Sequence, residues 1–228
     1  MAWGDNIQSA VGHTVSSLTL ASYAVAAGDN KILAVLVGTE LIGTPGINTV
    51  THNAVGMTQR ASAISTTESA DTLNRIYDLA MGSTTPTGDI VATAGAAQDG
   101  FVVTAMTAAG LVQQAPEATA TEVEVNVTTT SLSITTVTAN AEILDGATSE
   151  RNSGVFAVGA TNQNLLSQAV DRCTLMVSEQ TATSIGSYDM QWDDGPARSV
   201  DFTHCIAAYE VISAGSTHHV HLPLLGVG

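Results

Sequence analysis

The sequence predicts an all-β fold, an antiparallel β-sandwich of jelly-roll type. Apolar and polar residues alternate in short runs that are bounded by Gly, Pro, Asn, Asp, Ser and Thr, which is typical of strands joined by turns. Hydrophobic residues make up 44 % of the 228 residues but aromatic residues only 4 %. The core must therefore consist mainly of Val, Ile, Leu and Ala, a mixture that favours strands. No long helical period separates the runs, which argues against a parallel α/β sheet.

The expected strands follow one another along the chain. Residues 32–37 are continuously apolar and predict a central strand covered on both faces, after a turn at residues 28–30. The run 122–127 predicts a half-buried strand whose valines face the core and whose glutamates face water. Residues 164–170 alone suggest a helical turn. The other expected strands cover residues 13–20, 48–52, 57–63, 73–79, 89–93, 101–107, 132–138, 154–158, 173–178, 184–192 and 202–212.

The length of the chain fits a single sandwich domain. We assign residues 13–213 to this domain, residues 1–12 to an N-terminal arm and residues 214–228 to a C-terminal docking arm. The Ala- and Thr-rich stretch 114–121 is predicted to be the crossing connection between two halves of the domain, within it rather than at a boundary.

The two arms contain residues that we expect at an interface with another subunit. A solvated tail would not normally expose Leu222, Leu224 and Leu225. Trp3 is one of few large aromatic side chains and is expected to anchor the core or an interface. His219 and His221 are two residues apart, so in an extended arm both point to one side. Several copies around a symmetry axis could then form a metal site, although no carboxylate nearby would orient the imidazoles.

The charge of the chain limits its partners. The formal net charge is −15, and the six Lys and Arg residues are scattered. Because nucleic-acid affinity depends on groups of Lys and Arg, we expect no nucleic-acid partner. No run of about 18 apolar residues and no export signal is visible, so we expect no membrane segment.

The sequence gives no sign of catalysis. The common phosphate-binding, dinucleotide-binding, zinc-protease and hydrolase motifs do not occur, so we expect neither an enzyme nor a cofactor. Asp193 and Asp194 could supply two carboxylates for glycoside cleavage, but neighbours on a strand face opposite ways, and a solvated turn is the favoured interpretation. The same geometry opposes a pair of His204 and Cys205 acting as base and nucleophile. Cys173 and Cys205 are expected to be buried free thiols, with a disulfide as the alternative.

Seven segments of the chain share a common strand-and-turn pattern: residues 28–35, 47–55, 76–79, 86–91, 101–103, 109–112 and 205–211. Together they resemble a family of β-sandwich domains that is common in structural proteins of bacteriophages and prophages. The resemblance covers about residues 13–213 and rests on pattern, not on a catalytic signature. At Asn53-Ala54 the chain departs from the family, which tends to have Asn-Gly, the pair that suits a type I′ hairpin.

This resemblance implies a scaffold in a virion and no shared catalytic apparatus. The expected role is a capsid decoration protein, made in the cytoplasm of the bacterial host, that binds the outer capsid surface as a homo-oligomer, with a trimer preferred. Its partners would be the major capsid protein or other virion proteins. The alternative is a tail-fibre or receptor-binding module that recognises glycans, which would present aromatic side chains in its loops.

Overall fold

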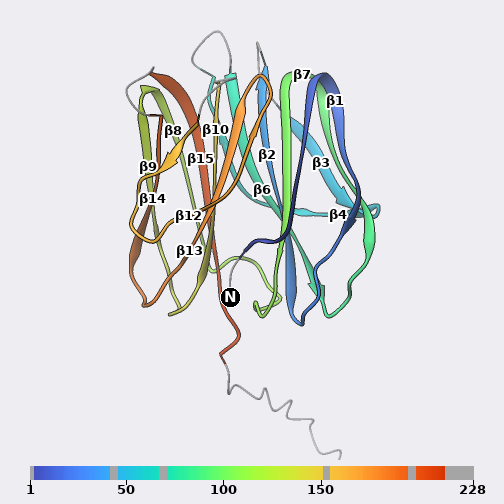
Figure 1. The fold of residues 1–228 in the computed structure, drawn as a ribbon, viewed down its shortest axis with the longest axis vertical. Coiled ribbons are helices and arrows are strands. Elements are labelled where there is room, and N and C mark those ends of the chain that lie inside the picture. Colours follow the sequence, from blue (N-terminus) through green and yellow to red (C-terminus); the bar gives the residue numbers. More distant parts are fainter. Residues whose placement is uncertain (1–2, 42–45, 67–70, 151–154, 195–198, 214–228) are drawn as a thin grey trace, which may run out of the picture.

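The prediction of an all-β antiparallel sandwich is confirmed (Figure 1). The computed structural model describes residues 3–41, 46–66, 71–150, 155–194 and 199–213. Every regular element within these ranges is a strand, and none of them contains a helix that could cross a membrane.

Strands occupy most of both halves of the chain. The first half contains β1 (Asp5–Ala24), β2 (Lys31–Leu41), β3 (Ile47–His52), β4 (Val55–Gly56), β5 (Thr58–Ile64), β6 (Asp71–Gly82) and β7 (Thr87–Ala108). The second half contains β8 (Ala118–Val127), β9 (Thr129–Thr135), β10 (Glu142–Ser149), β11 (Ala157–Val158), β12 (Asn164–Val170), β13 (Thr174–Thr181), β14 (Ser187–Asp193) and β15 (Val200–Tyr209). Residues 112–117 join the halves. The connection expected at 114–121 is therefore right for its first part, whereas residues 118–121 belong to β8.

The second half repeats the topology of the first. The order β5-β6-β2-β7-β1 recurs as β12-β13-β10-β15-β8, and the order β3-β7-β1 recurs as β11-β14-β9. In the first half the long strands β1 and β7 run through both parts, so these parts form one continuous seven-stranded sheet that folds over on itself around the core of this half. In the second half each of them is replaced by two separate strands, β8 with β9 and β14 with β15. Each half is therefore a sandwich of two parts, called its larger and its smaller sheet.

The strand register makes residues of the two halves equivalent. Phe101 lies opposite Thr39 in the first half, and Phe202 lies opposite Ser149 in the second. In the smaller sheets, Ala92 lies opposite Val50 as Trp192 lies opposite Val158. Sequence analysis did not detect this duplication, because few equivalent positions carry the same residue.

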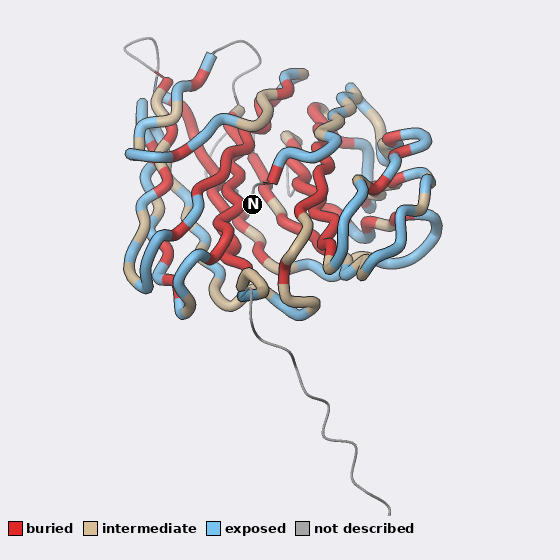
Figure 2. Tube along the Cα trace, turned by 60° about the horizontal axis from the view of Figure 1, so that its bottom comes forward, coloured by how far each residue is buried: buried red, intermediate tan, exposed pale blue. Residues whose placement is uncertain are grey.

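The larger sheets of the two halves pack face to face, and the central red strands of Figure 2 are buried by this contact. The backbones approach closely at two glycines. A Cβ atom on Gly146 would lie 2.3 Å from Cδ2 of Leu36, and one on Gly38 would lie 2.6 Å from Oγ1 of Thr148. In each pair a residue contacts its own equivalent, so β2 and β10 cross at the centre of the contact. The shared core contains Ile32, Ala34, Leu36, Ile76, Val102, Met106, Leu144, Leu175, Val177, Cys205 and Ala207.

The N-terminal region is built into this core. Trp3, which we expected to anchor the core or an interface with another subunit, is only 1 % exposed, and its ring meets Tyr209 edge-on at a centroid distance of 5.1 Å. Residues 5–12, expected to belong to an arm, form the first part of β1 and pair with β7. This segment therefore belongs to the first sheet.

Three other details differ from expectation. Residues 164–170 form the edge strand β12, so the helical turn predicted there is wrong. The strand β10, buried along its whole length, was not predicted at all. In β8 a register shift places Phe202 opposite Glu124, and Val123 is 40 % exposed instead of facing the core.

The Asn53-Ala54 hairpin forms in spite of its missing glycine. Asn53 has a φ of 49° and Ala54 a φ of 63°, as a type I′ turn requires at both central positions. Asparagine tolerates this region well, whereas alanine does so at a cost in strain.

Candidate functional site

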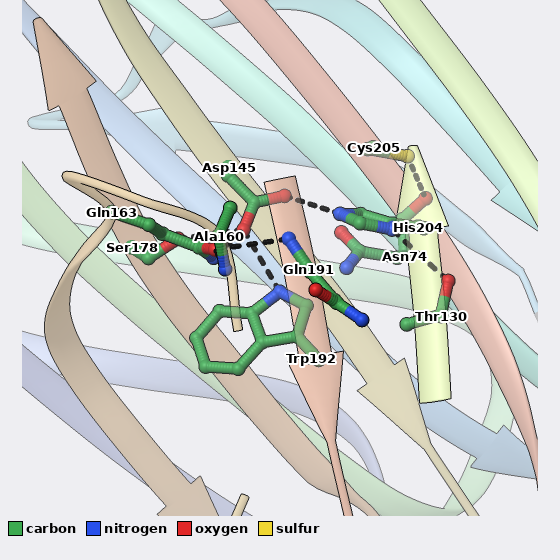
Figure 3. A network of polar contacts seen from close by, with 10 residues as sticks. All are labelled: Asn74, Thr130, Asp145, Ala160, Gln163, Ser178, Gln191, Trp192, His204 and Cys205. Atoms are coloured by element: carbon green, nitrogen blue, oxygen red, sulfur yellow. Dashed lines mark hydrogen bonds and ion pairs between the residues drawn. The ribbon is translucent and has the colours of Figure 1, made fainter. Parts of the chain in front are cut away.

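The most elaborate group of polar side chains lies inside the second half, between its larger and smaller sheets (Figure 3). Its centre is Asp145 of β10, which is completely buried. Its Oδ2 accepts hydrogen bonds from Nε1 of Trp192 at 2.8 Å, from Oγ of Ser178 at 2.6 Å and from Nε2 of Gln163 at 3.3 Å. Its Oδ1 is bonded to Nε2 of His204. We assign the proton to the imidazole nitrogen, because a carboxylate oxygen can only accept.

The imidazole connects this carboxylate to a hydroxyl group. Nδ1 of His204 lies 3.2 Å from Oγ1 of Thr130 on β9. The order hydroxyl, imidazole, carboxylate is the one found in nucleophilic triads. However, Thr130, His204 and Asp145 each have an exposed fraction of 0 %. No substrate can reach this hydroxyl in the folded structure, so the three groups act on the stability of the core.

The network has no counterpart in the first half. The position equivalent to Asp145 is Val35, which pairs with Ala105 and Tyr77 as Asp145 pairs with Ile206 and Ser178. The other equivalents are apolar or aromatic too: Val103 for His204, Leu18 for Thr130, Ala92 for Trp192 and Tyr77 for Ser178. At these positions the same fold thus has apolar or aromatic side chains in the first half and a hydrogen-bonded polar network in the second.

A buried carboxylate is tolerated only when its lone pairs are satisfied. The donors around Asp145 come from four different places in the chain, namely β13, β14, β15 and the segment before β12. Each of these segments must be in place for the group to be satisfied. The network therefore favours a single arrangement of these four segments. Apolar contacts, which have no fixed direction, would by themselves tolerate other arrangements.

Gln163 carries the network outward to the surface. Its Nε2 donates to Oγ of Ser178 at 2.8 Å, while its Oε1 accepts from the backbone nitrogens of Gln191 at 2.9 Å and Ala160 at 3.3 Å. One side chain thus connects the turn before β12 to β14 and to the buried carboxylate.

The cysteines and His204 lie as expected. Cys205 points away from the Asp145 network and donates to the backbone oxygen of Asn74 at 3.3 Å, so it and His204 face opposite sides of β15. Cys173 and Cys205 are free and buried, which confirms the prediction of buried thiols. Burial raises the pKa of both thiols, which makes them poor nucleophiles.

The acidic pair at the end of β14 is less exposed than predicted. Asp194 is only 6 % exposed and its backbone nitrogen donates to the oxygen of Thr128 at 2.9 Å. The interpretation as a solvated turn is therefore wrong for Asp194, while Asp193 lies half-buried at the end of the strand.

Two glutamates near the contact between the halves have perturbed acidities. Burial, and then the neighbouring carboxylate of Glu142, raises the pKa of Glu179 from 4.5 to about 7. Burial, and then the charges of Glu150 and Asp99, raises the pKa of Glu40 to about 7. Each of these carboxyl groups is harder to ionise in the folded protein than in an unfolded chain.

The remaining candidate residues lie outside the described ranges. These are the predicted metal ligands His219 and His221 and the predicted interface residues Leu222, Leu224 and Leu225. Among the described residues no group of three or more His, Cys, Asp or Glu side chains is placed to hold a metal ion.

Sequence reasoning missed Asp145 because it missed β10. The run Ala141 to Thr148 contains Glu142, Asp145 and Gly146, which interrupt the apolar pattern of a buried strand. One signal in the sequence could have revealed this strand. Asp145 is the single carboxylate between the apolar residues Ile143-Leu144 and Ala147, and an acid within an apolar run needs buried hydrogen-bond partners.

A comparison of the chain with known protein families, with curated proteins and with solved structures finds no match.

Proposed function

We propose that the protein is a structural component of a bacteriophage virion, a decoration protein that binds the outer surface of the capsid as a homo-oligomer. The observation that carries the proposal is the face-to-face packing of two sandwiches around one shared core. A chain built in this way is a rigid block whose two halves cannot hinge without exposing apolar surface. A reinforcing role on a shell uses this rigidity, and the sequence resemblance to phage β-sandwich proteins supplies the virion context.

The charge distribution supports a protein partner rather than DNA. The net charge is −15, and several of the few cations are engaged within the fold. Arg60 pairs with Asp78 at 2.8 Å, Arg75 donates to Oγ of Ser62 at 3.0 Å, and Lys31 is fully buried. The outer surface is therefore strongly acidic, which favours a basic patch on the capsid protein and disfavours nucleic acid.

One end of the molecule offers a starting point for docking. The described chain ends at Ser213, beside a hollow of about 520 Å³ whose lining includes Val112, Gln114 and Ile212. The leucine-containing segment 214–228 begins here, a few residues after Tyr209, which contacts Trp3. We therefore place the capsid-facing surface at this end.

Electron cryomicroscopy of the phage particle that carries this protein tests the proposal. We expect a double-sandwich density on the outer capsid surface, in symmetry-related copies, with the end around Ser213 toward the shell. Mass spectrometry of the same purified particles should find this chain in a fixed ratio to the major capsid protein. Density confined to the tail, or a chain absent from purified particles, would contradict the proposal.

A further inference from the structure

The outer strands of the sheets, which have a neighbour on one side only, differ in how their free edges are protected. A free edge presents unpaired backbone N–H and C=O groups, and proteins protect such edges with bulges, with charges, by covering them or by keeping them short. The outer strands β1, β5, β8 and β12 each contain an extra residue that shifts their register. In addition, β5 lies against β8, and β1 lies against β12, where the two halves meet. The outer strands β4 and β11 are only two residues long.

The remaining outer strand, β9, has neither a bulge nor a charge. It pairs with β14 in one continuous register over seven residues, and no other described strand pairs with it (Figure 1). It consists of Thr, Ser, Leu and Ile, so it also lacks proline. Its exposed residues are Thr129, Ser131, Ser133 and Thr135. This regular, uncharged edge is therefore of the kind that a further strand can extend.

The equivalent edge in the first half is interrupted. There β1 contains an extra residue, and Ser22 has a φ of 53°. The backbone nitrogen of Ser22 donates to Oδ1 of Asp89 at 2.8 Å, which holds the bulge in place. In the second half the equivalent carboxylate, that of Asp189, instead accepts from Oγ of Ser133 on an uninterrupted strand. The same position of the fold thus has a broken edge in one half and a straight edge in the other.

The backbone groups of β9 that point away from β14 belong to alternate residues. Beyond one end of the strand, the nitrogen of Thr136 donates to the oxygen of Gly186 at 2.9 Å. Beyond the other end, the oxygen of Thr128 accepts from the nitrogen of Asp194 at 2.9 Å. Because hydrogen bonds of an antiparallel pair alternate along the strand, the even-numbered residues of β9 bond to β14. The outward N–H and C=O groups are those of Thr129, Ser131, Ser133 and Thr135.

The sequence of β9 is complementary to itself. Read from either end, it is Thr-x-Ser-Leu-Ser-x-Thr. Two copies can therefore pair antiparallel around a twofold axis at Leu132. Ser131 then lies opposite Ser133 of the partner copy, and these residues exchange a pair of hydrogen bonds through their outward groups. Thr129 lies opposite Thr135 of the partner copy in the same way. Pairs of Ser and Thr are favourable across strands, and no like charges oppose each other in this register.

The inner face and the neighbouring strand also fit this arrangement. Leu132 is half-buried beside the core cluster that contains Ile134 and Met190, and the copy of Leu132 would cover its exposed part. Asp189 and its copy would be three strand spacings apart, roughly 14 Å, a distance at which salt screens most of their repulsion.

We propose that β9 is an interaction surface for a second copy of this chain, and that antiparallel pairing of β9 with β9 forms a twofold-symmetric dimer. The two sheets β11-β14-β9 would join into one continuous sheet. The dimer goes beyond the proposed function, which names neither a surface nor a symmetry for the oligomer, and its symmetry differs from the trimer that the sequence favoured. The dimer forms in solution. Its absence would leave the virion location standing, and absence of the chain from virions would leave the dimer standing.

Sedimentation equilibrium of the full-length chain tests the association. We expect a concentration-dependent equilibrium between one chain and two. Ser131→Pro removes an outward N–H group while the hydrogen bonds to β14 remain, so it should weaken the dimer about tenfold or more. Thr19→Pro makes the same change at the equivalent position of the first half and should leave the dimer unchanged. A chain that stays monomeric or forms only trimers, or equal losses in the two variants, overturns the proposal.

Cysteine cross-linking tests the register without the proline variants. The native thiols are buried, so only an introduced thiol should react in the folded protein. With copper–phenanthroline as the oxidant, Leu132→Cys should form a disulfide between two chains, because the axis brings the two Cα atoms to about 4.5 Å. Thr129→Cys is the control, since Thr129 is more exposed but its two copies would lie about 20 Å apart. Equal cross-linking of both variants, or none of Leu132→Cys, overturns the proposal.

Discussion

Replacing Asp145 by alanine should be among the most damaging single substitutions in the second half. The variant removes the acceptor of four hydrogen bonds at a site from which water is excluded. Ser178 and Gln163 keep each other as partners, with their side chains 2.8 Å apart. Trp192 and His204 lose the acceptor of their Nε1 and Nε2 groups.

The expected loss of stability follows from these two orphaned donors. A buried donor without a partner costs about 1–3 kcal/mol, so two of them cost roughly 2–6 kcal/mol. We expect about 4 kcal/mol, which is a large share of the roughly 5–15 kcal/mol that holds a typical domain together. For a chain of this size the corresponding change in Tm is roughly 8–16 °C.

Equilibrium unfolding in urea, followed by tryptophan fluorescence, measures this loss directly, since Trp192 is a member of the network. Asp189→Ala is the control, because Asp189 is exposed and its removal should change stability by less than about 0.5 kcal/mol. The double variant Asp145→Val with His204→Val installs the first-half residues and should be less damaging than the sum of its single variants. A loss below about 1 kcal/mol for Asp145→Ala would refute the assignment of a stabilising network.

Three further predictions concern the core and the contact between the halves. Gly146→Ala should destabilise the protein by about 1–3 kcal/mol, because the new Cβ atom would lie 2.3 Å from a methyl group of Leu36 in the other half. Gly186→Ala is the control and should be close to neutral, because no atom lies within 4 Å of its new Cβ atom. Urea unfolding of both variants compares the two free energies of unfolding. Folding raises the pKa of Glu179 from 4.5 to about 7, so the unfolded chain loses this proton first and the free energy of unfolding should fall as the pH rises from about 4.5 to about 7. Tm measured across this window should fall less in Glu179→Gln than in the unsubstituted protein. An identical slope of Tm against pH in both proteins would contradict the raised pKa. Cys173 and Cys205, both buried with raised pKa values, should react with a disulfide reagent only after unfolding, and fast labelling of the native protein would show that they are accessible.

The period-two pattern was sufficient for the fold class and for most strands. Residues 32–37 were predicted as a central strand and form the middle of β2, buried on both faces. The pattern misled where a strand departs from regular geometry. In β8 the valines alternate correctly, but a bulge near Asn126, whose φ is 55°, shifts the register and turns Val123 outward. A bulge reverses the faces of a strand without leaving a clear mark in the sequence.

The candidate site could not be predicted, because its members are far apart in the chain. Asp145, His204 and Thr130 come together only through the pairing of their strands and the packing of the two sheets of the second half. Their polar side chains also hid the duplication, since the first half has Val35, Val103 and Leu18 at the same positions. A repeat defined by register and not by residue identity is visible only in three dimensions.

Because the two larger sheets that pack together are equivalent to each other, the contact between the halves resembles the interface of a symmetric dimer, but one chain carries both sides of it. Two separate sandwiches joined through this surface would form a symmetric dimer, whose association depends on concentration and in which every substitution occurs twice. In a single chain the partner is always present, so dilution does not separate the halves. A substitution in one half is also not repeated in the other. Asp145 in one half and Val35 at the equivalent position of the other are a difference of this kind, and a symmetric dimer could not carry it on one side only.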